Sequence, residues 1–271
     1  MFLQIDPGTI AVITGAAGGI GAGVARALER RGVTLCLVDI DTQRLEAATS
    51  GVERATGYIC DVSDLEAVTH LSARLAATFG RIDLLVNNAG ISVAGALTGL
   101  PRAQFERAID VNFWGTVNCT TAFLPLLRAA RDSRRSAAIC NVLSDFALFS
   151  LPTKAPYAAS KHASRAYTEC LSAELFGEGI QVTAVYPGAT ATGLVRRGYA
   201  TDPVKQDREA HWLAGGMKPE FVGERIVRAI ERGRIRALIG RDARAIDFAT
   251  RLFPAFVQYL VARFWRRIPM L

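Results

Sequence analysis

The sequence is poor in cysteine and has no apolar run long enough to cross a bilayer. Its five cysteines, at positions 36, 60, 119, 140 and 170, show no paired spacing, and most lie within apolar runs. We expect reduced, buried thiols in an intracellular protein, with neither a disulfide framework nor a metal site. Without a run of about 18 apolar residues, no transmembrane helix is expected.

The first eight residues lack the basic region and long apolar segment of a signal peptide, so we expect a cytoplasmic protein. The chain also lacks zinc-finger spacing and an aromatic-basic platform, which argues against a nucleic-acid partner. Residues 191–271 carry 16 Lys and Arg against 8 Asp and Glu, a net charge of +8, whereas residues 1–190 carry 16 against 17. This basicity is typical of solvated, arginine-rich helices.

A glycine-rich turn follows the first apolar run. Residues 9–14 form a short apolar segment that predicts a buried parallel strand, and residues 24–31 predict a helix that ends at Gly32. Between them stands Gly15-Ala16-Ala17-Gly18-Gly19-Ile20-Gly21. In a strand–turn–helix unit, such glycines let the backbone approach a pyrophosphate at the positive end of the helix. The order therefore predicts a dinucleotide site.

An acidic residue ends the second predicted strand, residues 33–38. Asp39 lies about twenty residues beyond the glycines, where a carboxylate can accept hydrogen bonds from the adenosine ribose and repel a 2′-phosphate. Ile40 stands where a basic residue would have favoured that phosphate. We expect NAD rather than NADP; the alternative is a simple turn acid at the strand end. Asp41 is interpreted as the N-cap of the next helix.

Strands and helices continue to alternate, which favours one doubly wound α/β domain. Ser63-Asp64-Leu65-Glu66 is a capping-box pattern that opens a helix, and Pro101 opens a long helix in which Asn112 is a mediocre helix former. The remaining strands are expected at residues 58–60, 82–86, 137–142 and 181–186.

Tyr157 and Lys161 are four residues apart on a predicted helix that begins near Pro156 and ends at Gly177. At this spacing the two side chains share one face of the helix. A phenol has a pKa near ~10, and a neighbouring ammonium lowers it toward the range of a useful acid–base group. Such a phenol can take a proton from an alcohol or return one to a carbonyl oxygen.

Together these motifs resemble the short-chain dehydrogenase/reductase family, from Thr9 to about Gly240. The resemblance implies a Rossmann-type sheet of seven parallel strands, with residues 236–239 as the last strand. It also implies a catalytic tetrad of Asn112, Ser144, Tyr157 and Lys161. The implied cofactor contacts are Thr14, Gly15, Gly19, Ile20, Gly21, Asp39, Asp61, Val62, Asn88, Ala89, Gly90, Tyr157, Lys161, Pro187, Gly188, Thr190 and Thr192.

The implied activity is hydride transfer between NAD and a secondary alcohol or ketone. Ser144 would orient the substrate oxygen, Tyr157 would exchange the proton, and Lys161 would lower the pKa of Tyr157 and bind the nicotinamide ribose. Asn112 would disturb its helix and link Lys161 to solvent through water. The alternatives are an NADP-dependent carbonyl reductase and a non-catalytic sensor or scaffold that binds the dinucleotide.

Two positions depart from the family pattern: Leu143 replaces a frequent serine and Ala147 a frequent glycine, and both bear on the substrate pocket. The segment 193–221 is where this fold usually carries its substrate loop. An apolar pocket or simple loop packing accounts equally well for its bulky residues and for those after Ser144, namely Leu194, Val195, Tyr199, Trp212, Leu213, Phe146, Leu148 and Phe149. By analogy with the family we expect a homodimer or homotetramer.

The C-terminal residues 241–271 extend past the family core of residues 1–240. Apolar residues recur there at helical spacing, and residues 254–271 contain no acid. We expect this helix to pack on its own domain or on a partner subunit, so that deletion of residues 253–271 causes aggregation or loss of the oligomer. Docking on an anionic membrane is the less favoured alternative. The stripe consists of Phe253, Phe256, Val257, Leu260, Val261, Phe264 and Ile268.

Overall fold

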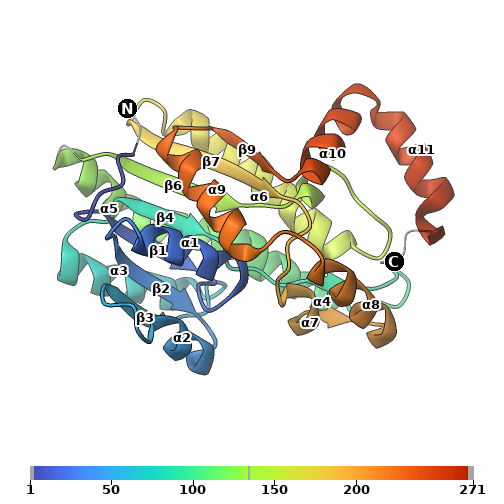
Figure 1. Ribbon diagram of the computed structural model, residues 1–271, viewed down its shortest axis with the longest axis horizontal. Helices are drawn as coiled ribbons and strands as arrows, with labels where there is room; N and C mark the ends of the chain where they lie inside the picture. The colour runs from blue at the N-terminus through green and yellow to red at the C-terminus, as the bar shows by residue number, and fades with distance from the viewer. Residues whose placement is uncertain (1–2, 134, 268–271) are drawn as a thin grey trace.

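A seven-stranded parallel sheet forms the centre of the protein in the computed structural model, which describes residues 3–133 and 135–267 (Figure 1). The strand order is β3-β2-β1-β4-β6-β7-β9. This confirms the doubly wound α/β fold and its seven parallel strands. The strands are β1 Ile10–Thr14, β2 Thr34–Asp39, β3 Ala55–Ile59, β4 Leu84–Asn87, β6 Ala137–Val142, β7 Ile180–Pro187 and β9 Arg236–Ile239.

Helices cover both faces of the sheet, as the right-handed crossovers of parallel strands require. A small parallel sheet of β5 Val93–Ala94 and β8 Tyr199–Ala200 lies apart from the main one. The helices of the body are α1 Gly19–Glu29, α2 Thr42–Thr49, α3 Leu65–Phe79, α4 Arg102–Ile109, α5 Gly115–Asp132, α6 Ala155–Glu174, α7 Leu194–Arg197, α8 Pro203–Ala214 and α9 Pro219–Glu231.

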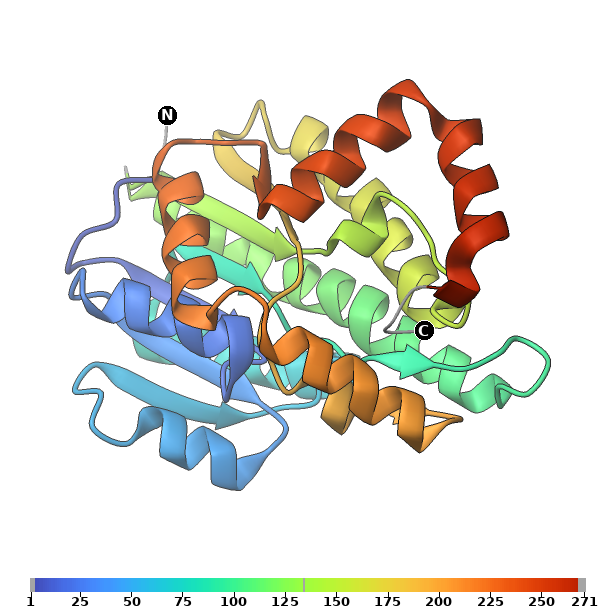
Figure 2. The same ribbon diagram turned by 45° about the vertical axis from the view of Figure 1, so that its right-hand side comes forward.

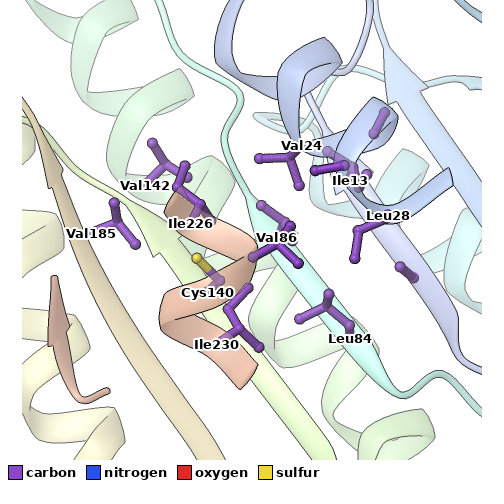
Figure 3. Close-up of a cluster of buried hydrophobic side chains, with 14 of the residues drawn as sticks. Ile13, Val24, Leu28, Leu84, Val86, Cys140, Val142, Val185, Ile226 and Ile230 are labelled. Carbon is purple, nitrogen blue, oxygen red and sulfur yellow. The ribbon is translucent and has the colours of Figure 1, made fainter. Parts of the chain in front are cut away.

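Helices α1 and α9 cover one face of the sheet. Val24 and Leu28 of α1 and Ile226 and Ile230 of α9 lie over strand residues such as Val86 (Figure 3). All five side chains are fully buried. This apolar layer fixes the helix whose N-terminus faces the glycine turn, so the core also positions the site.

The two helices approach each other closely where glycine faces glycine. A Cβ atom on Gly223 of α9 would overlap the backbone of Gly23 in α1. Beside this crossing, Arg31 donates to Glu231 at 2.6 Å and to Glu224 at 3.1 Å. The contact therefore combines close backbone packing with a rim of ion pairs.

The opposite face carries α3, α5 and α6. Leu75, Phe123 and Leu127 are fully buried there and pack under β1, β4 and β6. Helix α6 brings Tyr157 and Lys161 to the carboxyl end of the sheet, and α5 continues the helix that contains Asn112. The site is thus framed by elements from both halves of the chain.

Several element boundaries differ from the sequence-based expectation. The N-cap of α3 is Asp64 rather than Ser63, because the Asp64 carboxylate accepts from the backbone N–H groups of Glu66 and Ala67. Helix α1 begins at Gly19, within the glycine turn, and α6 ends at Glu174, three residues before Gly177. Asp41 does cap α2 through the N–H of Arg44 at 3.1 Å.

The C-terminal extension consists of α10 Arg241–Leu252, α11 Pro254–Phe264 and a 3₁₀ turn, Trp265–Arg267. Helix α10 is anchored to the body, because Asp247 pairs with Arg236 of β9 at 2.8 Å and Ala243 is buried. In Figures 1 and 2, α11 stands away from the body at the end of α10. No helix within residues 3–133 and 135–267 is both long and apolar enough to cross a membrane.

Candidate active site

The glycine turn leaves open the N-terminus of α1. Gly15 and Gly19 have φ values of +62° and +55°, which favour glycine. No side chain caps the helix at Gly18, so its first backbone N–H groups remain available to a ligand. A Cβ on Gly21 would overlap the carbonyl oxygen of Gly15. This backbone cradle fits the pyrophosphate of a dinucleotide.

Thr14 and Asn88 lock the cradle to the end of β4. The Thr14 hydroxyl accepts from the N–H groups of Asn88 and Ala89, both at 3.0 Å. The Asn88 amide donates to the carbonyls of Thr14 and Gly15, also at 3.0 Å. Thr14 is buried beneath the turn, so it holds the loop in place and lies outside the walls of the cavities described below.

A cleft of about 310 Å³ runs from the glycine turn to Tyr157, and we call it the dinucleotide cleft. It joins residues that are distant in sequence at the carboxyl end of the strands, where parallel α/β sheets bind ligands. Nine of the residues expected to contact the cofactor line this cleft: Gly15, Gly19, Ile20, Asp39, Asn88, Gly90, Tyr157, Lys161 and Thr192.

Asp39 lies at the end of this cleft, but two arginines that the sequence analysis missed lie there too. The Asp39 carboxylate accepts from the N–H of Ala17 at 2.9 Å and from that of Asp41 at 3.2 Å. Arg44 and Arg197 line the same cleft. Burial and the neighbouring Arg44 lower the pKa of Arg197, opposed by Asp39 and Asp41. An acidic residue and two arginines therefore share the end of the cleft where the adenosine ribose is expected.

An adjoining pocket contains Asp61, Val62 and Ala89, three of the expected cofactor contacts. Asp61 is paired with Arg107 at 3.0 Å and accepts from Ser63 at 2.6 Å. Burial opposes ionisation of Asp61, but its hydrogen bonds with Ser63 and Arg107 outweigh it and lower the pKa. The Asp61 carboxylate is thus held charged and fixed in orientation.

Tyr157 and Lys161 meet at the inner end of the cleft. The Lys161 ammonium lies 5.8 Å from the centre of the Tyr157 ring and donates to the carbonyl of Val142 at 3.2 Å. Burial lowers the pKa of Lys161 to about 8. Phe146 packs edge-on against the Tyr157 ring at 5.7 Å, which restrains the phenol.

The surroundings of Tyr157 raise its pKa, so the lowering expected from Lys161 stays a prediction. Burial raises the pKa of Tyr157, the negative charges of Asp145 and Glu209 add to this, and only the Ser144 hydroxyl opposes it. Burial disfavours the charged phenolate, and Lys161 is not among the groups that change the pKa of Tyr157 here. At neutral pH the phenol therefore carries its proton.

Ser144 is buried and interacts with the residue that follows it. Its hydroxyl donates to the Asp145 carboxylate at 2.8 Å and accepts from the N–H of Phe146 at 3.2 Å, at the start of a 3₁₀ turn, Asp145–Ala147. Burial raises the pKa of Asp145 to about 6, with a further contribution from Asp242. Whether the Ser144 hydroxyl donates to Asp145 therefore depends on the charge of the Asp145 carboxyl group.

Asn112 lies in a π-helical turn, Asp110–Trp114, that interrupts the helix between α4 and α5. Such single turns often occur at functional sites. The Asn112 amide accepts from the N–H of Ile91 at 2.8 Å and donates to Ser160 at 2.9 Å. A Cβ on Gly90 would lie 3.0 Å from Asn112 and 3.7 Å from the Lys161 ammonium. Asn112 therefore ties the loop after β4 to α6 behind Lys161.

A second cavity, of about 290 Å³, opens on the other side of Tyr157, and we call it the substrate cavity. Three further expected cofactor contacts, Pro187, Gly188 and Thr190, line it. Of the bulky residues considered in the sequence, Leu148 and Tyr199 lie outside its wall. The apolar wall includes Leu143, Phe146, Phe149, Leu194, Val195, Trp212 and Leu213, which supports the apolar-pocket interpretation.

Four charged residues that the sequence analysis missed also line the substrate cavity. Lys154, just before α6, forms a buried ion pair with Glu209 of α8. Asp145 and Asp242 lie in the wall as well, and Asp242 accepts from the N–H of Ala189 at 2.7 Å. Only the fold brings these distant positions together, so no local pattern marked them.

Comparison with known proteins agrees with this geometry. Residues 9–202 match the family model described as short chain dehydrogenase. The chain belongs to the short-chain dehydrogenase family. It is 35% identical over 265 residues to the SadH protein of Mycobacterium tuberculosis, with 94% of each chain covered.

Solved structures of the short-chain dehydrogenase family share the whole fold. One from Burkholderia phymatum, in complex with NAD, has a TM-score of 0.84 and 26% identity and covers 96% of both chains. Another, from Burkholderia cenocepacia in complex with NADP, has a TM-score of 0.77 and 29% identity, with 96% of this chain and 98% of the other covered. The two complexes hold different dinucleotides.

The thiols fit the sequence analysis in part. Cys36, Cys60, Cys119 and Cys140 are buried, whereas Cys170 is exposed. Burial raises the pKa of the Cys36 and Cys60 thiols. Across the part of the chain that the structure describes, no cluster of three or more His, Cys, Asp or Glu could hold a metal ion.

Proposed function

We propose that the protein is an NAD-dependent oxidoreductase that transfers hydride between a secondary alcohol or ketone and the nicotinamide. The observation that carries this proposal is that Tyr157 lines both the dinucleotide cleft and the substrate cavity. A proton donor at this junction can reach a substrate oxygen while the adjoining carbon faces the cofactor. The largely apolar wall of the cavity favours an apolar substrate.

The residues of the site divide the chemistry between them. The nicotinamide, when bound, supplies the hydride acceptor or donor. In alcohol oxidation Tyr157 would act as its phenolate and take the O–H proton, while hydride leaves the carbon and the C=O bond forms. Ketone reduction reverses these steps, with the protonated phenol as the acid. Ser144 orients the substrate oxygen next to Tyr157.

Lys161 and Asn112 support the proton transfer at Tyr157. Lys161 lines the dinucleotide cleft, where its ammonium can bind the nicotinamide ribose and favour the phenolate. Asn112 fixes the loop that contains Gly90 and the helix that contains Lys161. We infer that a proton reaches Lys161 along this buried polar route.

The preference for NAD rests on Asp39, because a carboxylate at the ribose end repels a 2′-phosphate. Arg44 and Arg197 support the alternative, an NADP-dependent carbonyl reductase, because a guanidinium can bind that phosphate. We favour NAD because the Asp39 carboxylate is fixed by two backbone N–H groups at the cleft.

The central test is Tyr157→Phe. This substitution keeps the ring that packs on Phe146 but removes the phenol that the two cavities share. We expect dinucleotide binding, followed by calorimetry, to be retained, while turnover of a panel of secondary alcohols and ketones falls by about 10²–10⁴.

The matched control is Tyr167→Phe, which removes a phenol from the same helix at a position that lines neither cavity. We expect this variant to keep its turnover. If Tyr157→Phe turns over like the unmodified protein, the proposed mechanism is wrong. Dinucleotide binding without turnover of any substrate in the unmodified protein would favour a sensor or scaffold.

A further inference from the structure

The C-terminal arm, which we define as residues 248–267, is poorly packed on the rest of the chain. No residue of α11 is buried among the described residues, and its main contacts are with α10 and with the 3₁₀ turn that follows it. In both ribbon views, α11 extends from the end of α10 beside the body (Figures 1 and 2). Helix α11 therefore packs only weakly on its own domain.

The arm exposes an unusual amount of apolar surface. Phe256, Leu260 and Phe264 follow at spacings of four residues, so they share one face of α11, and Phe253 stands at its N-terminus. Phe248 and Leu252 extend the exposed surface onto α10. These six side chains and Tyr259 are between 37% and 64% exposed. A group of exposed, bulky apolar side chains of this kind marks a site of interaction with a protein or a membrane. Ile268 lies outside the described residues.

The charge of the arm has one sign. Arg251, Arg263, Arg266 and Arg267 are its four charged residues, and the sequence contains no acid after Asp247. Arg263 and Arg267 lie over the ring of Phe264, and Arg266 lies over that of Trp265, each within 5.5 Å. Among the described residues, no acidic side chain pairs with these three arginines. The end of the arm therefore combines aromatic rings with uncompensated positive charge.

This combination fits an anionic lipid surface better than a second copy of the chain. Residues 191–271 carry a net charge of +8, so the arm would meet like charge on the same region of another copy. Anionic headgroups, in contrast, neutralise guanidinium groups, while aromatic rings insert at the interface. Because no described helix is both long and apolar enough to span a bilayer, the arm would lie in the plane of the interface.

We propose that residues 248–267 dock the protein on an anionic bilayer surface, with the phenylalanine face inserted and the arginines at the headgroups. Helix α10 links this surface to the substrate cavity, because Asp242 and Ile246, six and two residues before the arm, line the cavity wall. Resting on the proposed function, the docked enzyme would act on lipophilic alcohols or ketones that partition into the bilayer.

The docking is tested by co-sedimentation of the full-length protein with vesicles of phosphatidylcholine, with or without phosphatidylglycerol. We expect binding that requires phosphatidylglycerol and weakens in high salt, because salt screens the headgroup charge. The triple variant Arg263→Gln/Arg266→Gln/Arg267→Gln should lower the partition coefficient about 100-fold, since each arginine contributes about fivefold at an anionic surface.

A matched control removes the same charge elsewhere in the basic region. Arg225→Gln/Arg232→Gln/Arg234→Gln changes three exposed arginines of α9 and the turn after it, and should leave binding within about threefold of the unmodified protein. Phe256→Ser/Phe264→Ser tests the apolar face and should also reduce binding. Equal losses in the two arginine variants would show nonspecific charge attraction and overturn the proposal.

Deletion of residues 253–271 separates the membrane from a second copy. We expect the truncated protein to lose vesicle binding but to keep its solubility and its molar mass by light scattering. If vesicles do not bind the full-length protein, or if truncation dissociates an oligomer and leaves vesicle binding intact, the proposal is wrong. Vesicle binding is measured without turnover, so a failure of the proposed enzymatic activity would not affect this result.

Discussion

Asp145 is the residue through which pH should act on the site. Its pKa is raised to about 6 by burial, so it gains negative charge as the pH rises through 6, and this charge raises the pKa of Tyr157. Asp145→Asn removes the charge but keeps an oxygen that accepts from Ser144. We therefore expect the acid limb of the pH profile of kcat/KM for alcohol oxidation to move to lower pH.

The profile is measured for both proteins with the same alcohol, at saturating dinucleotide. Asp145→Glu, which keeps the carboxylate, should retain an acid limb closer to that of the unmodified protein. An unchanged limb in Asp145→Asn would show that the charge of Asp145 does not influence proton transfer.

Asp39 decides the cofactor preference in the proposed function. We expect kcat/KM to favour NAD over NADP by roughly tenfold or more, the ratio that ~1.4 kcal/mol of repulsion between the carboxylate and the 2′-phosphate produces. Asp39→Ala should reduce the preference for NAD. The double variant Asp39→Ala/Arg44→Gln should have a lower kcat/KM with NADP than Asp39→Ala alone. Steady-state kinetics with both dinucleotides measures the ratio; a preference for NADP in the unmodified protein would contradict our interpretation of Asp39.

The residues that sequence alone could place are those with local patterns. Tyr157 and Lys161 share a helix face, and the glycines follow a strand, so their proximity comes from helix and turn geometry. Arg44 and Arg197 lie on different helices and meet only at the folded cleft. Lys154 and Glu209 likewise form a buried pair that no spacing indicates.

At the scale of elements, the crossing of α1 and α9 should be sensitive to a single methyl group. In Gly223→Ala the new Cβ would overlap the backbone of Gly23, which cannot move aside as a flexible side chain can. Overpacking of this kind typically costs 1–3 kcal/mol, so we expect the free energy of unfolding to fall by about that amount. Urea denaturation measures it.

The control for this prediction is Gly177→Ala, because a Cβ at Gly177 would meet nothing within 4 Å. We expect a change within about 0.5 kcal/mol, as for most surface substitutions. Equal stability of the two variants would show that the α1 and α9 backbones can separate at little cost.

Long elements with strong periodicity were predicted well, and short ones were not. Strand β6 has the predicted bounds because an apolar run marks a buried parallel strand, and β9 has the bounds that the family resemblance implied. The two-residue strands β5 and β8 carry no period of their own and form only where the loop after β4 meets the segment after β7. Helices α7 and α8 depend on tertiary contacts in the same way. The sequence analysis therefore treated residues 193–221 as one loop segment and predicted neither helix.

For the whole molecule, the ion pairs around Glu224 should make stability depend on pH in the acid range. Hydrogen bonds from Arg31 lower the pKa of Glu224 from 4.5 to about 2, with smaller contributions from Arg228 and Arg30. Because the folded-state pKa is depressed, this stabilisation is present above pH 4.5 and is lost as the pH falls toward 2. Glu224→Gln should lower the free energy of unfolding at pH 7 by about 1–3 kcal/mol.

The same variant should lose stability less steeply than the unmodified protein between pH 4.5 and 2, because it lacks the carboxylate that titrates there. Thermal unfolding across this range provides the comparison. Parallel stability curves would show that other carboxylates dominate the acid response.

The wall that separates the two cavities has a thermodynamic consequence. Ile20, Leu143, Tyr157, Thr192 and Leu194 line both the dinucleotide cleft and the substrate cavity. A ligand that orders this wall from one side lowers the entropy cost of binding on the other side. By linkage the effect is reciprocal, so a substrate analogue that tightens dinucleotide binding by some factor must itself bind more tightly by the same factor once the dinucleotide is present.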